Sequence, residues 1–161
     1  MSRIYTVVFQ GTVTNAGGDQ DWLEVLPADD KPVRLRGMKY GQISEVADAA
    51  EEGLRISILR LPATVTSGSG GSAPTPAPLD SADVAAGFAA EVNNTTIATT
   101  NGTIITLEEL AWNIRNSPYE TWWPDERFAP IVKQGEALII RQQTTVADDI
   151  TACLTFYLEE L

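Results

Sequence analysis

The chain has 161 residues, of which 43% are hydrophobic and 20% are charged, and its formal net charge at pH 7 is −11. This length suits a single domain, and the acidic balance disfavours binding to nucleic acid or to an anionic membrane, since both depend on clustered Lys and Arg. No segment is long and apolar enough to span a bilayer and the N-terminus lacks the layout of a signal peptide, so we expect a protein that folds in a reducing cytoplasm.

The first part of the chain predicts three strands separated by turns. Residues 4–13 alternate between apolar and polar positions, which is typical of a strand with one buried face. A short strand follows at 22–26 and a longer one at 33–44. Gly37 and Gly41 interrupt the longer strand, and glycines in such places often mark a bulge or a bend.

The next segments differ sharply in character. Residues 45–52 (EVADAAEE) favour a short helix or an acidic loop, because eight residues give only about two helical turns. Residues 54–61 predict a strand with its side chains on two faces: Leu54, Ile56 and Ile58 on one, and Arg55, Ser57 and Leu59 on the other.

Residues 67–81 (SGSGGSAPTPAPLDS) form the one low-complexity segment of the sequence. Gly and Ser give flexibility to its first half, while Pro74, Pro76 and Pro78 favour an extended conformation in its second half. The segment is either a tolerant surface loop or an arm that lies on a neighbouring subunit.

The middle of the chain predicts further strands at 88–94 and 103–113. Residues 107–114 also have apolar residues at helical spacing, but the β-branched run before them favours a strand. Residues 117–128 (SPYETWWPDERF) read as an irregular aromatic loop.

The C-terminal residues 135–161 predict two strands joined by a turn. The last strand alternates over ten residues, and such a long β-branched and aromatic strand is expected to pair with residues 4–13 rather than to form an edge. With about eight strands and almost no helix, the chain 1–161 is expected to form one all-β domain, either an antiparallel sandwich or a barrel, with the first and last strands in one sheet.

The sequence contains no histidine and a single cysteine, Cys153. This excludes His-dependent triads, histidine metal clusters and thiolate zinc sites. The pairs Asp19/Asp21 and Asp29/Asp30 are better explained as turn residues than as calcium ligands. We therefore expect no enzyme activity, no metal and no cofactor.

The aromatic loop is the best candidate for a contact surface. It contains Tyr119, Trp122, Trp123 and Phe128 among several prolines. Rigid aromatic residues beside charged ones occur in protein interfaces and in sugar-binding platforms. Three interpretations remain open: the loop caps the core, forms a subunit interface, or binds carbohydrate.

Several stretches together resemble a family of small all-β virion proteins encoded by tailed bacteriophages. They are the Thr- and Val-rich first strand, GSGG-x-x-PTPAPL, NNTT-x-ATT, P-x-VKQGEALIIR and the closing FYLEEL. The resemblance implies a jelly-roll-like β-sandwich and a non-enzymatic role, either as a head decoration or cement protein or as a neck, tail or fibre protein.

The resemblance also implies partners and a location. They are the major capsid protein and further copies of the chain, joined as a dimer or trimer on the head surface of a virion assembled in the host cytoplasm. The candidate interface residues are Tyr119, Trp122, Trp123 and Phe128 of the aromatic loop and Pro74, Pro76 and Pro78 of the proline-rich segment. A carbohydrate-binding module that uses the aromatic loop is the alternative from a different class.

Overall fold

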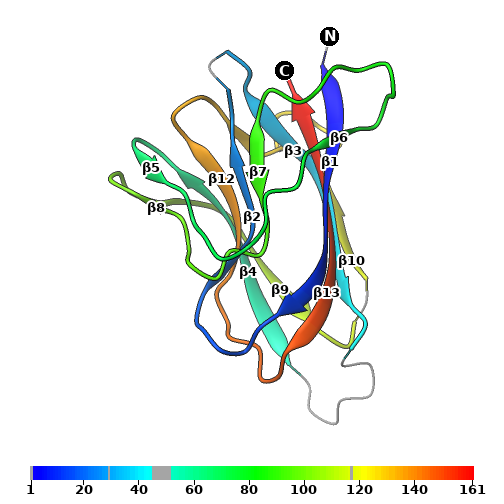
Figure 1. Ribbon diagram of the computed structural model, residues 1–161, viewed down its shortest axis with the longest axis vertical. Helices are drawn as coiled ribbons and strands as arrows, with labels where there is room; N and C mark the ends of the chain where they lie inside the picture. The colour runs from blue at the N-terminus through cyan, green and yellow to red at the C-terminus, as the bar shows by residue number, and fades with distance from the viewer. Residues whose placement is uncertain (1, 29, 45–51, 117) are drawn as a thin grey trace.

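Two antiparallel sheets packed face to face make up the computed structural model, which describes residues 2–28, 30–44, 52–116 and 118–161 (Figure 1). Sheet A has the order β10 (Tyr119–Trp122), β3 (Val33–Gln42), β13 (Ile150–Glu160), β1 (Arg3–Val13) and β6 (Ala77–Pro78), and β11 (Ile131–Val132) also pairs with β3. Sheet B has the order β7 (Ala89–Glu91), β2 (Gln20–Leu26), β12 (Ala137–Gln142), β4 (Gly53–Leu61) and β9 (Ile105–Asn113). A separate pair joins β5 (Val65–Thr66) to β8 (Thr99–Thr100).

The connections between the long strands follow the jelly-roll pattern. Sheet A contains β10-β3-β13-β1 and sheet B contains β2-β12-β4-β9, so that the chain changes sheet at each step except from β4 to β9. Eight strands in two such sheets are the hallmark of the jelly roll. The predicted all-β sandwich with jelly-roll character is therefore confirmed, and the strands β12 and β13, adjacent in sequence, lie in different sheets.

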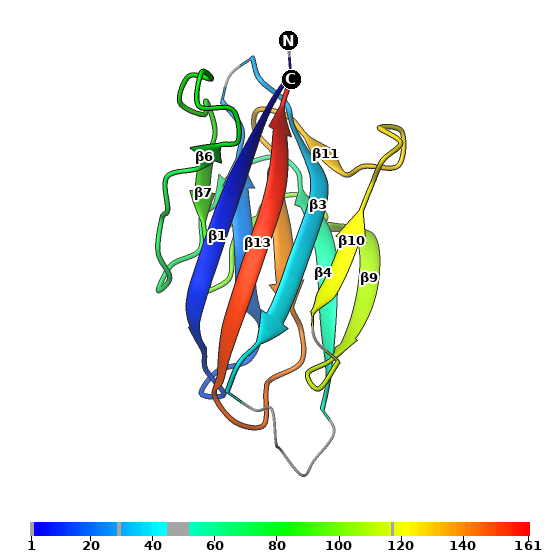
Figure 2. The same cartoon turned by 90° about the vertical axis from the view of Figure 1, so that its right-hand side faces the viewer.

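The first and last strands pair along their whole length, as predicted. The register of β1 and β13 runs without a break from Arg3 opposite Glu160 to Val13 opposite Ile150. Both strands alternate between buried and more exposed residues. The two ends of the chain therefore form the middle of sheet A, with β3 beside β13 (Figure 2).

Gly37 marks the predicted irregularity in β3. Opposite β13, the register shifts between Tyr157, which faces Gly37, and Leu158, which faces Leu35. The bulge places one extra residue in β3 and alters the direction of its outward side chains. The space that a side chain at Gly37 would fill is occupied by the ring of Trp122.

The main core fills the space between the sheets. Its largest fully buried side chains include Trp22 from β2, Tyr40 from β3 and Trp112 from β9. These three rings meet edge to face, with centroids 5.2–6.1 Å apart. Aromatic pairs favour this geometry because the positive edge of one ring meets the negative face of another.

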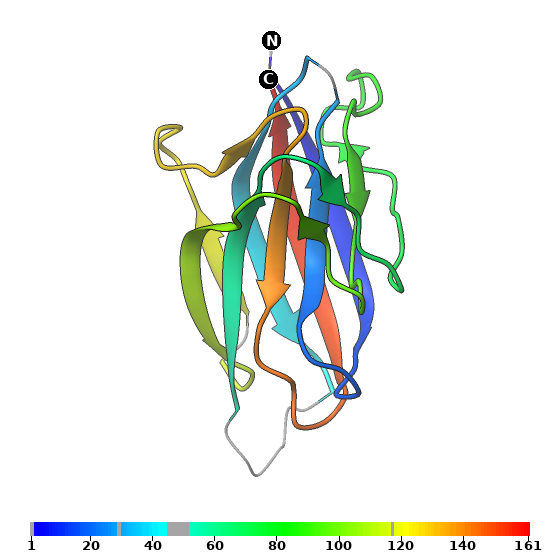
Figure 3. The ribbon, with the colours of Figure 1, turned by 90° about the vertical axis from the view of Figure 1, so that its left-hand side faces the viewer.

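A second, smaller core lies on the outer side of sheet B. On the first predicted face of β4, Leu54, Ile56 and Ile58 join the main core. The second face is exposed at Arg55 but buried from Ser57 onward, where Leu59 and Leu61 join the smaller cluster. The smaller cluster is closed by residues of the connection 62–104, which crosses the outer face of sheet B (Figure 3).

A buried ion pair fixes that connection to sheet B. Arg141 on β12 donates to both carboxylate oxygens of Asp21 on β2, at 2.6 and 3.1 Å, and also to the carbonyl of Ala98 at 2.9 Å. The amide of Ala98 donates back to Asp21 at 2.7 Å. Nearby, Glu24 accepts hydrogen bonds from Ser67 and from the amide of Gly68.

The same connection extends the edges of both sheets. Its strand β6 pairs with β1 in sheet A, and its strand β7 pairs with β2 in sheet B. An uncovered edge strand can pair with a strand of another chain, so the connection 62–104 protects this side of the sandwich.

Several sequence predictions need correction. The described residues form thirteen strands rather than about eight, because five of them have only two or three residues and leave no periodic pattern. The aromatic segment 117–128 is not wholly irregular, since Tyr119–Trp122 forms a strand beside β3. The expected strand 88–94 shrinks to Ala89–Glu91 and isolated bridges.

Two other predictions have different outcomes. The strand at 103–113 is confirmed as β9, against the helical alternative. The helix or acidic loop expected at 45–52 lies, apart from Glu52, outside the described residues. The part of the chain that the structure describes contains no helix able to cross a membrane.

Candidate functional site

The outer faces of the two sheets differ in what covers them. The connection 62–104 packs on sheet B, whereas the view of sheet A shows its long strands β1, β13 and β3 uncovered (Figures 2 and 3). Large apolar side chains remain exposed on sheet A, among them Val8 (56%) on β1 and Trp122 (43%) on β10. Exposed apolar side chains gathered on one face indicate an interaction surface. Sheet A therefore presents the candidate site.

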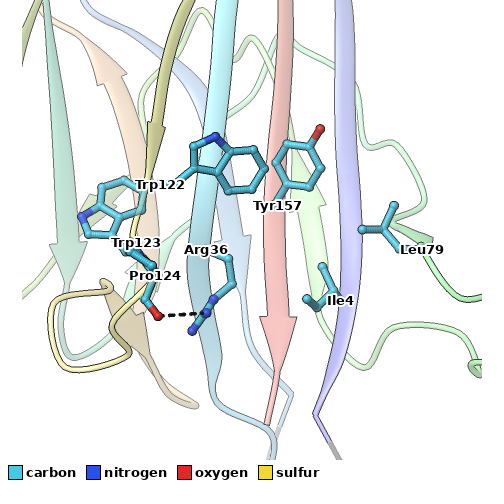
Figure 4. Close-up of a pocket in the computed structure, with 7 residues that line it drawn as sticks. All are labelled: Ile4, Arg36, Leu79, Trp122, Trp123, Pro124 and Tyr157. Atoms are coloured by element: carbon cyan, nitrogen blue, oxygen red, sulfur yellow. Dashed lines mark hydrogen bonds between the residues drawn. The ribbon is translucent and has the colours of Figure 1, made fainter.

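A shallow pocket of about 300 Å³ lies on this face (Figure 4). It is lined mostly by apolar side chains from five parts of the chain: Ile4, Arg36, Leu79, Trp122, Trp123, Pro124 and Tyr157. Arg36 supplies the one charged side chain of this lining, and its guanidinium lies 3.5 Å from the carbonyl oxygen of Pro124. The guanidinium also pairs with Glu159 at 3.5 Å, so the pocket is suited mainly to an apolar side chain.

Trp122 forms one wall of the pocket, and its position depends on Gly37. A Cβ atom at Gly37 would overlap the six-membered ring of Trp122, so the indole lies flat over the backbone of β3. The ring also packs against Tyr157, with centroids 4.7 Å apart and planes 39° apart. The bulge at Gly37 therefore allows the aromatic wall to form.

Charged groups hold Trp122 from its outer side. The ammonium group of Lys39 lies 5.4 Å from the centroid of the Trp122 ring and 6.0 Å from that of Tyr157. Glu120 accepts a hydrogen bond from the indole N–H and pairs with Lys39 at 3.4 Å. These two interactions hold the pKa of the Glu120 carboxyl below its usual value, with the indole hydrogen bond as the larger cause.

The two adjacent tryptophans have opposite environments. Trp122 is 43% exposed, whereas Trp123 is only 7% exposed and belongs to the main core, although it also reaches the pocket lining. Tyr119 points inward and stacks on Tyr40, with centroids 4.7 Å apart. Tyr119 and Trp123 thus pack with the core, whereas Trp122 faces outward, and its contact with a partner stays a prediction.

Phe128 lies apart from this pocket. Its side chain is 74% exposed, and it borders a separate hollow with Arg60, Leu107 and Ile131. The turn that carries it is closed by a hydrogen bond from the amide of Phe128 to the carbonyl of Asp125. The expected cluster of four aromatic residues is thus divided between two surfaces and the core.

The three prolines lie along the side of the sandwich. Pro76 is buried, while Pro74 and Pro78 are half-buried, and Pro78 pairs with Tyr5 of β1. The next residue, Leu79, donates its amide to the carbonyl of Ile4 at 2.9 Å and lines the pocket. Contact of this segment with a neighbouring subunit stays a prediction.

Sequence reasoning missed four residues of the pocket: Ile4, Arg36, Leu79 and Tyr157. Two of them carried a signal, because Ile4 and Tyr157 are large side chains on the outward phase of alternating strands. Arg36 and Leu79 had no such signal, since their positions depend on the β3 bulge and on the pairing of β6.

The described carboxylate and cysteine side chains do not gather into a metal site. No group of three or more carboxylate or cysteine side chains within the described ranges is placed to hold a metal ion. Asp19 and Asp21 are both expected to be turn residues. This expectation is wrong for Asp21, which forms the buried ion pair with Arg141.

Comparison with known proteins does not assign a family. No family model matches the chain, and no curated protein matches it significantly. Solved structures of infectious bursal disease virus align at low similarity: the Gx strain at 12% identity with a TM-score of 0.22, and the T13 particle at 8% identity with a TM-score of 0.20. These alignments cover 99% of this chain but 42% and 39% of the viral chains, so the chain spans about two fifths of their length. Likeness at this level carries no functional argument.

Proposed function

We propose that this protein is a non-enzymatic structural component of a virus particle, and specifically a decoration or cement protein on the head of a tailed bacteriophage. In this role it binds the capsid shell through the aromatic pocket around Trp122. The observation that supports the proposal is the difference between the two faces of this jelly roll: the connection 62–104 covers sheet B, whereas sheet A is uncovered and carries an aromatic pocket.

The known functions of jelly-roll proteins narrow the range of functions to consider for this chain. Jelly rolls occur in viral capsid proteins, in lectin domains and in cupins. A cupin site relies on histidine ligands, and this chain has no histidine. A fold alone does not establish a function, so the choice between virion protein and lectin depends on the site.

The arrangement of Lys39 argues against a sugar platform. A sugar ring would have to stack on the open face of Trp122 or Tyr157, and the Lys39 ammonium lies over both rings. The pocket itself is mostly apolar and offers few groups to read hydroxyls. A protein side chain suits this pocket better, because buried aromatic anchors dominate protein interfaces.

The test is to locate the protein on particles. An antibody against the chain should place immunogold over the heads of tailed particles from the culture that produces it. Gold on necks or tails would support the alternative structural role in the same virion. Particles that lack the protein altogether would contradict a virion role.

A pair of variants tests the pocket in the same assay. Trp122→Ala should weaken association with depleted heads by about 2–4 kcal/mol, because it removes an aromatic wall of the proposed contact. Ile104→Ala is the matched control, since Ile104 is also 43% exposed but lies outside the pocket lining. Equal binding by both variants would remove the pocket from the proposed contact, and loss of binding on a glycan array alone would favour the lectin alternative.

A further inference from the structure

An uncharged strip runs beside the pocket on the outer face of sheet A. We define it by the outward residues of β1, of β13 and of the end of β3: Thr6, Val8, Gln10, Thr12, Gly41, Ile43, Thr151, Cys153 and Thr155. None of these residues is charged, although the chain carries 22 acidic and 11 basic residues. Depletion of charge is what distinguishes the centre of a protein interface from the remaining surface.

The surface of the strip is flat with two projections. Val8 and Ile43 are 56% and 58% exposed, and both project from among short side chains. Val8 lies opposite Thr155 in the β1–β13 register, and Gln10 lies opposite Cys153. Across a two-fold axis, each projecting side chain of one copy can rest on the short side chains of the other.

The charge of the whole chain indicates which partner suits this strip. Each copy carries a net charge of −11, so most contacts between two copies would bring acidic groups together. The nearest charged side chain, Lys39, lies directly opposite Thr155 at the edge of the strip and is paired with Glu120 at 3.4 Å. The uncharged strip therefore permits two acidic copies to approach without unpaired charges facing one another.

We infer that the uncharged strip binds the same strip of a second copy, giving a two-fold symmetric dimer in which the two A sheets pack face to face. Neighbouring strands lie about 4.8 Å apart and rise about 3.4 Å per residue, so the strip is at most about 15 Å wide and about 24 Å long, and it narrows away from β1. This is small for a specific interface, so the dimer should be weak and reversible, with a dissociation constant in the micromolar range or above. The inference does not depend on the virion role proposed above.

The experiment is sedimentation equilibrium of the full chain over about 1–500 µM, a range that covers weak dimers. Val8→Glu should raise the dissociation constant at least about 100-fold, because it buries an unpaired carboxylate against the uncharged side chains of the other copy. Val84→Glu is the matched control: the same substitution at a valine of the same 56% exposure outside the strip, where the dissociation constant should stay within about threefold. Circular dichroism melts of both variants check that folding is unchanged.

A second readout locates the contact. Cys153 is the one cysteine of the chain and lies within the strip, so its reaction with a thiol reagent should slow as the wild-type protein dimerises and should not slow in Val8→Glu. Three results would overturn the inference: a monomer throughout the concentration range, equal weakening by the two valine variants, or dimerisation that leaves Cys153 equally reactive. A monomeric wild type whose head binding is lost in Val8→Glu would also overturn it, assigning the strip to the shell while leaving the proposed virion role intact.

Discussion

Trp122 and Trp123 show how one residue step changes the role of a side chain. They are neighbours in a short extended segment, and successive side chains of such a segment point to opposite faces. Trp123 therefore enters the main core, and its amide donates to the carbonyl of Arg36 at 3.0 Å. Trp122 turns outward onto Gly37 and Tyr157. A binding variant should change the first tryptophan and leave the second intact.

Gly37→Ala tests the dependence of the aromatic wall on a missing side chain. The added Cβ would overlap the Trp122 ring, so either the ring leaves Tyr157 or the β3 backbone shifts. Overpacking of this kind costs about 1–3 kcal/mol, and we expect a loss of unfolding free energy in that range together with a red shift of tryptophan emission. Gly53→Ala is the control in another strand, because a Cβ at Gly53 meets nothing within 4 Å. No change in Gly37→Ala would show that the ring moves away without cost.

At the scale of elements, a buried ion pair fixes the connection 62–104 to sheet B. Asp21 and Arg141 are 0% and 4% exposed at their side chains. Burial raises the pKa of the Asp21 carboxyl even though Arg141 and the amide of Ala98 act to lower it. The ion pair and its hydrogen bonds to Ala98 therefore link β2 and β12 of sheet B to the connection 62–104.

Arg141→Met tests this contact. Removing one partner of a buried ion pair leaves an unpaired charge, which costs about 3–5 kcal/mol of unfolding free energy. Asp21→Asn combined with Arg141→Met should recover most of that loss, because no buried charge then remains. Chemical denaturation measures both variants, and hydrogen exchange should show residues 62–104 opening first. Arg55→Met is the control at an exposed ion pair with Glu109, and it should leave stability nearly unchanged. A single variant as stable as the wild type would show that the insertion is held by its apolar contacts.

The elements also show how far the sequence predicts this fold. The alternation in 150–160 predicted both the last strand and its pairing with β1, because a period of two persists over a long segment. Tyr119–Trp122 escaped prediction, since four residues between prolines are too few to establish a period. Asp21 and Arg141 lie 120 positions apart, and the local signal was Arg141 following the apolar run ALII in β12. The pocket depends on tertiary pairing of β6 and β10, which no local pattern specifies.

At the scale of the whole molecule, the two outer faces of the sandwich differ in what covers them. Sheet B is covered by the connection 62–104. Sheet A is left with the aromatic pocket across one end of its strands, lined by Ile4 of β1 and Tyr157 of β13, and with the uncharged strip toward the other end of the same strands. The two features lie side by side on one sheet. A dimer through the strip would hold two pockets on one particle component, and two linked contacts bind more tightly than either alone.

The net charge makes a prediction about salt that separates an uncharged contact from one made of ion pairs. Two copies of charge −11 repel each other at long range, and this repulsion is screened over about 30 Å at 0.01 M salt but over about 10 Å at 0.1 M. Raising NaCl between these values should therefore strengthen the dimer, lowering its dissociation constant at least about tenfold, or about 1.4 kcal/mol.

The same titration at pH 5 is the control for this salt effect. The isoelectric point is about 4.3, so the repulsion between copies is smaller at pH 5 and the dependence on salt should be shallower. Sedimentation equilibrium at both pH values provides the measurement. A dimer that weakens as salt is added would contradict the uncharged strip, because only ion pairs across the contact lose strength by screening.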